Sequence, residues 1–239
     1  MTKDEFFWLC TINRATVVVG LKNNQFDRTL AEKAAHGIAA VEALGKTDPA
    51  KRVKSYIAWE PLLIEAAGAE VTAIHAGRSS QDILSTQRCA LLRDALLDFE
   101  AGLDDVIGDL ITLADKHRDT IVPSYTNGVA AQPTSYAHTL LGIIHSLLRV
   151  RKRSAECYTR LNTSSMGATV LNGTGWPLDR QGMAEALGFS KPVDNAFDAT
   201  SLAPVDMPLE VASCLGAAAV RIGSMINDIM VQYSQPRPW

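Results

Sequence analysis

Three segments of this 239-residue chain repeat apolar residues every three and four positions, and this heptad pattern limits the fold more than any other feature. A seam of more than three heptads predicts a helix of roughly 35–45 Å at ~1.5 Å per residue, well beyond the average globular helix. The seams consist of Cys89, Leu92, Leu96, Phe99, Leu103, Val106, Leu110 and Leu113; of Tyr136, Leu140, Ile143, Leu147, Val150, Cys157 and Leu161; and of Ala212, Leu215, Ala219, Ile222, Ile226, Ile229 and Tyr233.

Additional apolar residues lie beside each seam and widen the apolar stripe beyond a two-stranded contact. This width favours a bundle whose helices are buried on more than one side, and it predicts association between copies of the chain. We therefore predict a mainly α fold, with a smaller helical N-terminal region over residues 1–80 and a central long-helix bundle over residues 81–239. The flanking residues are Leu91, Leu97, Ile107, Leu141, Ile144, Leu148, Met225 and Met230.

Shorter elements are marked by capping residues and glycines. Asp27 is a suitable N-cap for an amphipathic helix that ends at Gly45. Residues 162–206 are rich in Gly, Ser, Thr, Asn and Pro, which predicts loops around one short helix, Gln181–Leu187, stopped by Gly188. Strand signals are confined to two short apolar runs that fit a helix equally well, 17–19 and 169–171.

Composition excludes several classes of function. The 23 Lys and Arg residues nearly balance the 26 Asp and Glu residues, so neither nucleic acid nor a membrane surface is favoured as a partner. No uninterrupted apolar run approaches the ~18 residues of a membrane span, and the four cysteines lie far apart without metal-ligand spacing. We expect buried thiols, a cytoplasmic setting, no metal and no cofactor, since phosphate-binding glycine loops, zinc signatures and nucleophile elbows are also missing from the sequence.

A cluster of polar side chains directly precedes the first seam. The free N–H groups and the positive dipole end of the predicted helix would favour an anion such as a substrate carboxylate there. A purely structural interpretation fits as well, with a serine as N-cap, the aspartate as a first-turn charge and the arginine in a surface pair. The cluster comprises His75, Arg78, Ser79, Ser80, Gln81 and Asp82.

A second polar cluster lies about forty residues later, where Thr126, Asn127 and Gln132 could present donors to a carboxylate or an amide. Asn127-Gly128 is also a strong turn dipeptide, so an ordinary turn is an equally good interpretation. Pro133 is expected to open the next helix, because proline is favoured at the first helical position. Two clusters at helix starts suggest one shared pocket.

These residues also carry a resemblance to a known family. The run His75-Ala76-Gly77-Arg78-Ser79-Ser80-Gln81-Asp82 resembles the His-Thr-Gly-Arg-Ser-Arg-Asn-Asp signature of argininosuccinate lyases, within the fumarase/aspartase superfamily. The run from Tyr125-Thr126-Asn127 to Ala131-Gln132-Pro133 resembles that family's Tyr-Thr-His-Leu-Gln-Arg-Ala-Gln-Pro. Segments from Ser165 to Asp206 follow in the expected order, so the resemblance covers most of the chain.

The resemblance implies a homotetramer in which segments of three subunits assemble each active site. It implies an anti elimination that releases fumarate and an amine from a succinyl adduct through an aci-carboxylate, as in arginine biosynthesis. In that chemistry Arg78, Ser79, Gln81 and Thr126 would hold the carboxylates and the developing charge. The same resemblance gives His75, Ser80 and Gln132 supporting positions in the substrate site.

Departures from the family pattern bear on activity. Ser80 and Gln81 replace Arg and Asn, which alters the expected substrate, and Asn127 replaces a histidine that takes part in proton transfer. Family members are about twice as long and carry a catalytic serine loop beyond the segment that Pro236-Arg237-Pro238-Trp239 resembles. We therefore expect an N-terminal and central part that needs a separate C-terminal part for activity. The alternatives are a non-catalytic paralogue of the same fold and an unrelated helical-bundle binding protein.

Overall fold

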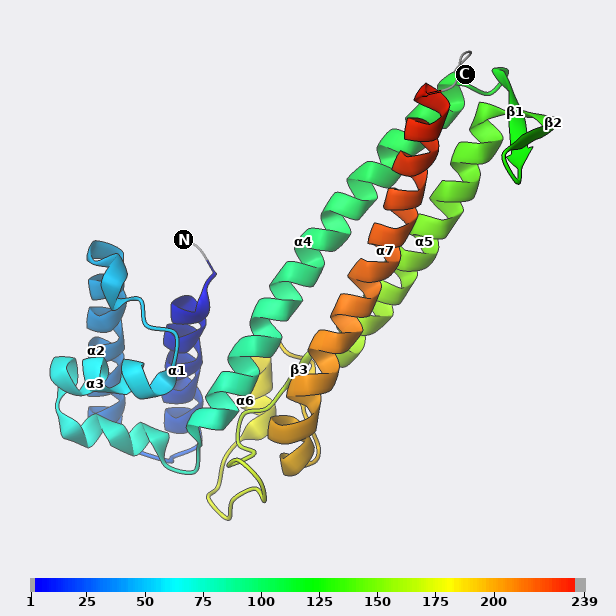
Figure 1. Ribbon diagram of the computed structural model, residues 1–239. Coiled ribbons are helices and arrows are strands. Elements are labelled where there is room, and N and C mark those ends of the chain that lie inside the picture. The colour runs from blue at the N-terminus through cyan, green and yellow to red at the C-terminus, as the bar shows by residue number, and fades with distance from the viewer. Residues whose placement is uncertain (1–2, 235–239) are drawn as a thin grey trace. The chain divides into compact units, whose positions relative to one another are not determined.

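The computed structural model describes residues 3–234 as helices with two small sheets (Figure 1). Its contacts divide the chain into two compact units. Unit 1 is Met1–Asp94 with Arg160–Pro208, and unit 2 is Ala95–Thr159 with Leu209–Trp239. This division differs from the expected boundary at residue 80, because the loop-rich segment after residue 160 packs with the N-terminal helices. The terminal segment 236–239, which carried part of the family resemblance, lies outside the described residues.

Unit 1 is built from short and medium helices. Its α-helices are α1 (Glu5–Lys22), α2 (Arg28–Thr47), α3 (Tyr56–Ala67) and α6 (Arg180–Ala186), together with the first turns of α4 (Ser80–Lys116) and α7 (Ala203–Tyr233). Shorter elements are the 3-10 helices η1 (Pro49–Lys51) and η2 (Ala69–His75), the π-helix η3 (Asp198–Leu202), and the parallel strands β3 (Thr163–Ser164) and β4 (Lys191–Pro192).

Aspartate N-caps fix where these helices start. Asp27 accepts from the backbone N–H of Leu30 and begins α2, as the sequence predicted, although α2 continues two residues past Gly45. Asp179 accepts from Gly182 N–H and begins α6, which matches the predicted short helix to within one residue at each end. The caps satisfy N–H groups that have no partner within the helix.

The core of unit 1 holds its helices against one another. Helix α2 contacts α1 and α3, and α1 contacts α6. Burial of apolar surface supplies the main driving force for this packing. The fully buried side chains of this core include Phe6, Leu9, Ile12, Ile38, Trp59, Leu63, Ile74 and Ile83. The undecided run 17–19 lies in α1, and the run 169–171 forms a turn rather than a strand.

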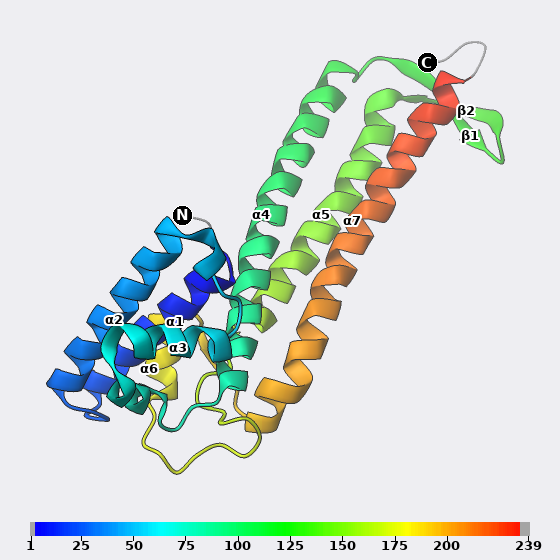
Figure 2. The ribbon, with the colours of Figure 1, turned by 60° about the vertical axis from the view of Figure 1, so that its left-hand side comes forward.

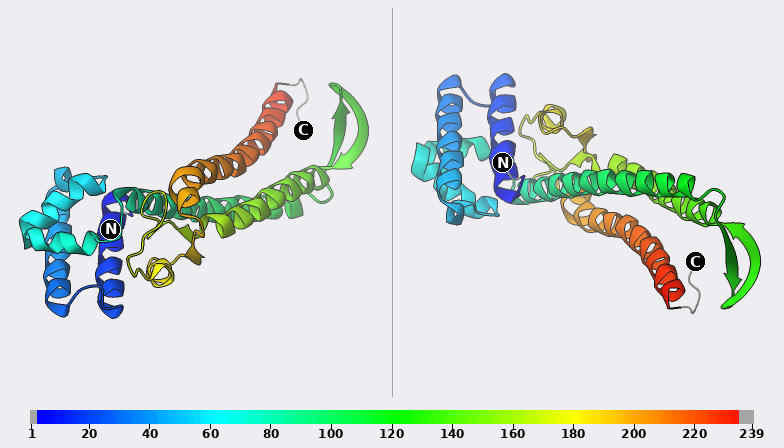
Figure 3. Two further views of the ribbon diagram at one scale, coloured as in Figure 1. Left: turned by 90° about the horizontal axis from the view of Figure 1, so that it is seen from below. Right: turned by 90° about the horizontal axis from the view of Figure 1, so that it is seen from above.

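Unit 2 consists of three long helices and a hairpin. The unit 2 parts of α4 and α5 (Tyr136–Leu161) run side by side (Figures 1 and 2), and α7 lies along them at first and curves away toward its C-terminal end (Figure 3). Their shared core includes Leu103, Ile107, Leu110, Leu140, Ile144, Leu147, Val150 and Ala218. The antiparallel strands β1 (Ile121–Thr126) and β2 (Val129–Ser135) form a curved ribbon next to the start of α5 (Figure 3).

The three predicted seams differ in how much of each is buried. The α5 seam is largely buried, as expected for a bundle core, whereas four of the eight α4 seam residues are buried and Val106 and Leu113 are 37% and 36% exposed. The seam predicted for α7 is mostly exposed, with Leu215 at 40%, Ile229 at 50% and Tyr233 at 85%, whereas Val211, Cys214 and Ala218 are buried. Within the single chain, the buried face of α7 therefore differs from most of the predicted seam, although Ile222 of that seam packs against the core of unit 2. Because α7 carries apolar residues on nearly every side, periodicity alone does not select the face that meets α4 and α5.

Helix α7 also has an unusual overall hydropathy. The continuous helix Asp198–Tyr233 contains a window of mean hydropathy 1.5, long and apolar enough by composition to cross a membrane, and only 17% of that window is buried within the chain. The expectation that nothing in the chain approaches a membrane span thus holds only for uninterrupted apolar runs. A bundle helix with apolar residues on several faces has the same composition.

Pro133 does not open a helix. It lies in β2 opposite Pro123, and α5 begins three residues later at Tyr136. The polar segment around it forms a hairpin instead, because Asn127 and Gly128 both adopt positive φ values, 52° and 76°. Two such residues suit the tight turn that matches the right-handed twist of paired strands.

Candidate active site

The start of α4 is fixed by a reciprocal cap. The Ser79 hydroxyl accepts a hydrogen bond from Gln81 N–H at 3.1 Å, and the Asp82 carboxylate accepts one from Ser79 N–H at 3.4 Å. This is the capping arrangement that a Ser-x-x-acid spacing favours. The structural interpretation of Ser79 and Asp82 is therefore confirmed, and both residues hold the helix start in place.

Asp82 additionally binds a loop from the far part of unit 1. Its carboxylate accepts from Thr169 N–H at 2.9 Å and from Val170 N–H at 3.0 Å. Both residues adopt positive φ, which is costly for side chains with a branched Cβ. Asp82 is fully buried, and this burial raises the pKa of its carboxyl group although the three backbone N–H groups and Arg78 act in the opposite direction.

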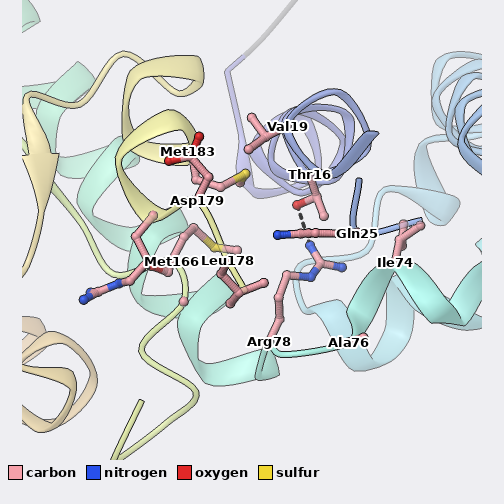
Figure 4. A pocket seen from close by; sticks show the side chains of 13 residues that line it. Thr16, Val19, Gln25, Ile74, Ala76, Arg78, Met166, Leu178, Asp179 and Met183 are labelled. Carbon is pink, nitrogen blue, oxygen red and sulfur yellow. Dashed lines mark hydrogen bonds between the residues drawn. The ribbon is translucent and has the colours of Figure 1, made fainter. Parts of the chain in front are cut away.

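Arg78 points into unit 1 and is only 8% exposed. Its guanidinium donates to Thr16 Oγ1 at 2.7 Å (Figure 4) and to Asn13 Oδ1 at 3.2 Å, so it joins the segment before α4 to α1. The expected surface ion pair is not formed, since no ion pair of Arg78 occurs in residues 3–234. Sequence reasoning missed Asn13 and Thr16 because they lie more than sixty residues upstream of Arg78 and carry no motif.

His75 lies beside Arg78 as an uncharged imidazole. Its ring stacks on Tyr56, with centroids 4.5 Å apart and planes at 13°. Burial, assisted by the nearby positive charge of Arg78, lowers the pKa of His75 to about 4. At neutral pH the ring can therefore donate or accept a hydrogen bond without carrying charge.

Ser80 and Gln81 remain partly exposed at the first turn of α4. The Gln81 side-chain amide donates to the Thr200 carbonyl at 3.4 Å, and Thr169 Oγ1 donates to the Gly77 carbonyl at 2.9 Å. A Cβ on Gly77 would lie 2.9 Å from the Trp176 side chain, and Gly77 has φ of 69°. The backbone of Gly77 therefore lies so close to the Trp176 side chain that a larger residue would not fit between them.

The second cluster belongs to unit 2. Thr126, Asn127 and Gln132 are exposed on the β1–β2 hairpin, where Gln132 pairs with Ser124. Tyr125 and Gly128 of the hairpin line a cavity of about 380 Å³ together with residues of α5 and α7. The two predicted clusters fall in different compact units, and neither unit contains both, so the shared pocket stays a prediction.

Unit 1 contains a much smaller cavity of about 20 Å³ (Figure 4). Its wall brings together α1, the segment before α4, and the region from Met166 to Met183. No group of three or more His, Cys, Asp or Glu side chains able to hold a metal ion occurs between residues 3 and 234. The four cysteines are buried, and burial raises the pKa of Cys10 and Cys89 to about 11, which keeps these two thiols protonated.

The sequence matches a family model described as Lyase over residues 21–237. It is 34% identical to the argininosuccinate lyase of Thiobacillus denitrificans over 164 residues, which cover 69% of this chain and 35% of that protein. The match thus covers about a third of the length of the curated relatives.

Solved structures give the same assignment of fold. EDDS lyase, solved in complex with formate and as a variant with bound fumarate, superposes with a TM-score of 0.91 at 27% identity, covering 97% of this chain and 46% of that one. The class II fumarase of Schistosoma mansoni superposes with a TM-score of 0.81 over 99% of this chain and 58% of its own, at 18% identity. The chain has the helical fumarase/aspartase fold, and the predicted fold class is confirmed.

Proposed function

Because the chain belongs to the lyase family, we propose that it supplies part of an active site that eliminates an amine from an N-succinyl substrate and releases fumarate. One observation carries this proposal. The start of α4 presents Ser80, Gln81 and an uncharged His75 around a helix N-terminus, while Ser79 and Asp82 hold that terminus rigid. Such a terminus favours the carboxylates of a succinyl group.

The hairpin would provide the second half of the substrate contacts. We assign Thr126 and Gln132 to a substrate carboxylate and Asn127 to the position beside the developing aci-carboxylate, where hydrogen-bond donors stabilise negative charge. An amide cannot exchange protons near neutral pH, so the proton donor and the base must come from residues other than Asn127. The length of the curated relatives supports a contribution from sequence outside this chain.

We further propose that the active chain is a cytoplasmic homotetramer in which different copies bring the two clusters together. The apolar residues exposed on α7 support this association. The buried thiols of Cys10 and Cys89 are compatible with a reducing compartment. Arginine biosynthesis is the corresponding pathway if argininosuccinate is the substrate.

Complementation tests the elimination directly. The chain is mixed with the C-terminal part of a related lyase, and fumarate absorbance is followed with argininosuccinate and other N-succinyl amines. We expect fumarate only in the mixture, and we expect its formation to fall at least tenfold for Gln81→Ala. Arg88→Ala, an exposed change further along α4, is the control and should leave the rate unchanged.

A non-catalytic paralogue of the same fold is the second candidate, and Asn127 is the observation that favours it. In that case the chain would assemble with a relative without producing fumarate from any N-succinyl amine. Assembly without turnover in the complementation experiment would therefore support the paralogue and contradict the elimination. Fumarate formation that depends on Gln81 would exclude the non-catalytic paralogue.

A further inference from the structure

Two Asn-Gly pairs occur in the sequence, and each lies in a turn of a different unit. Asn127-Gly128 forms the tip of the β1–β2 hairpin in unit 2 (Figure 1), and Asn172-Gly173 lies in the loop that follows β3 in unit 1. Both asparagine side chains are exposed. An asparagine before a glycine loses its side-chain amide more readily than other asparagines do, because glycine has no Cβ to hinder the approach of its nitrogen.

The two pairs differ in what the glycine nitrogen contacts. The Gly173 N–H donates to the Ala168 carbonyl at 2.9 Å. The Gly128 N–H donates no hydrogen bond within residues 3–234, because Gly128 lies at the turn between the paired residues Thr126 and Val129. The glycines are otherwise alike, with φ of 76° and 73° and nothing within 4 Å of an added Cβ. The hydrogen bond is therefore the difference that bears on the reactivity of the nitrogen.

We propose that Asn127 is a site of spontaneous deamidation in the folded chain, whereas Asn172 is protected. Solvent base removes the proton from the free Gly128 nitrogen, which then attacks Asn127 Cγ. A C–N bond forms, and the side-chain amide nitrogen takes up a proton and leaves as ammonia. The product is a cyclic imide that joins Asn127 to Gly128. At Asn172 the hydrogen bond to Ala168 keeps the proton on the Gly173 nitrogen and holds that nitrogen in place.

Water completes the reaction by opening the imide at one of its two carbonyl carbons. Opening at Cγ breaks the new C–N bond and leaves aspartate in an ordinary chain. Opening at the main-chain carbonyl breaks the original peptide bond and leaves isoaspartate, in which the chain runs through the former side chain. In either case the Gly128 nitrogen regains its proton, and asparagine and water have become a carboxylic acid and ammonia. No co-reactant other than water is needed.

Both products change the tip of the hairpin. Each adds one negative charge at residue 127, and isoaspartate also adds one carbon atom to the backbone between Thr126 and Val129, which pair in the hairpin. Since loop length sets the register of a hairpin, we expect the pairing next to the turn to weaken. If the function proposed above holds, the new carboxylate also repels the carboxylates of a succinyl substrate. The modification itself does not depend on that function.

Peptide mapping by mass spectrometry tests the proposal. The folded chain is kept at mildly alkaline pH in water enriched in the heavy oxygen isotope, and is then digested at acidic pH in ordinary water. The isotope marks only the aspartate and isoaspartate that formed during the incubation. Because the Gly173 hydrogen bond must open first, we expect conversion at Asn127 to be on the order of tenfold faster than at Asn172. Equal rates, or no conversion at Asn127, would overturn the proposal.

The unfolded chain is the control for the effect of the fold. In guanidinium chloride the hydrogen bond between Gly173 and Ala168 is lost, so the two pairs should convert at similar rates. If Asn127 stays the faster site by the same factor, the local sequence accounts for the difference and the protection of Asn172 by the fold is wrong.

Two matched variants confirm the assignment of the label. Asn127→Gln keeps an exposed amide but requires a larger ring for the same attack, so the label at residue 127 should disappear. Asn172→Gln makes the same change in the other exposed turn and should leave conversion at Asn127 unchanged. Label that persists at residue 127 in Asn127→Gln would contradict attack by the Gly128 nitrogen.

Discussion

Asp82 shows how a single buried residue can organise the start of a helix. Replacing Asp82 with Asn keeps the shape but leaves one oxygen to accept three backbone N–H groups, and it turns an amide N–H₂ toward at least one of them. We expect the free energy of unfolding to fall by about 1–3 kcal/mol, the usual range for an unsatisfied buried group. Urea denaturation followed by circular dichroism measures the change.

Asp98→Asn is the matched control, because Asp98 is exposed on the same helix. Its effect should stay within about 0.5 kcal/mol, as for most surface substitutions. Equal stabilities of the Asp82 and Asp98 variants would show that the Asp82 bonds contribute little.

His75 predicts a pH dependence of stability. Its folded pKa of about 4 lies below the ordinary value of 6.5, so between these values the unfolded chain binds a proton that the folded chain does not. Stability is therefore lost as the pH falls through this window, at no more than about 1.4 kcal/mol per pH unit and less because the ring is partly exposed. His75→Gln should flatten the slope in urea titrations between pH 4.5 and 6.5.

The control for this experiment is His138→Gln, which removes an exposed histidine from α5. It should retain the slope of the unchanged chain. If the variant His75→Gln keeps the pH dependence of the free energy of unfolding, that dependence comes from other titratable groups.

Sequence alone identified the residues at the start of α4 but not what they contact. The Ser-x-x-Asp spacing made Ser79 and Asp82 a recognisable cap. The loop partners Thr169 and Val170 lie 87 and 88 residues from Asp82, and no local pattern links them. Arg78 illustrates the same limit, since an arginine beside a helix start is normally exposed and here lies within the core.

At the scale of elements, the β1–β2 hairpin presents Asn127 at a position that suits a histidine equally well. Histidine tolerates the positive φ of 52° better than most side chains do. If proton transfer limits elimination, Asn127→His should raise the complemented rate by about 10²-fold, the lower range for general acid–base catalysis. Fumarate absorbance in the complementation assay measures this.

Asn127→Gly is the companion variant, since it keeps the turn and removes the side chain. It should not exceed the rate of the unchanged chain. An unchanged or lower rate for Asn127→His would count against a role of this position in proton transfer.

The positions of the long helices along the chain were predicted well, but the faces that these helices bury were predicted less well. The α5 seam has polar residues opposite it, so its periodicity identifies the buried side. The α4 seam does so only in part, because Ile107 and Ala114 are buried where the seam predicts Val106 and Leu113. In α7, apolar residues surround the helix, and Ala217, Ala218 and Met225 pack on the core together with Ile222 of the predicted set. The hairpin was missed as a hairpin because Pro123 and Pro133 lie within its strands, where proline argues against pairing.

At the scale of the whole molecule, the exposed side chains of α7 predict self-association. Val220 is 71% exposed and Met230 is 65% exposed. We expect the unchanged chain to elute as an assembly of several 25.8 kDa copies, and the variant Val220→Glu/Met230→Lys to elute at lower mass in light scattering. Charges introduced on an apolar interface disfavour its burial.

Val18→Glu/Ile57→Lys is the matched control, since these two apolar residues of unit 1 are 64% and 74% exposed. That variant should keep the mass of the unchanged chain. Equal masses for the α7 variant and the unchanged chain would show that this face is not the interface.

Unit 1 is formed from two separate segments of the chain, and this affects the order in which the protein can fold during synthesis. Residues up to Asp94 leave the ribosome first, but Arg93 binds Asn162 and the Gly188 carbonyl, which follow much later. At roughly 5–20 residues per second, the early helices wait on the order of ten seconds for these partners. During that interval their apolar faces are open to chaperones, and the high contact order of the unit slows its closure.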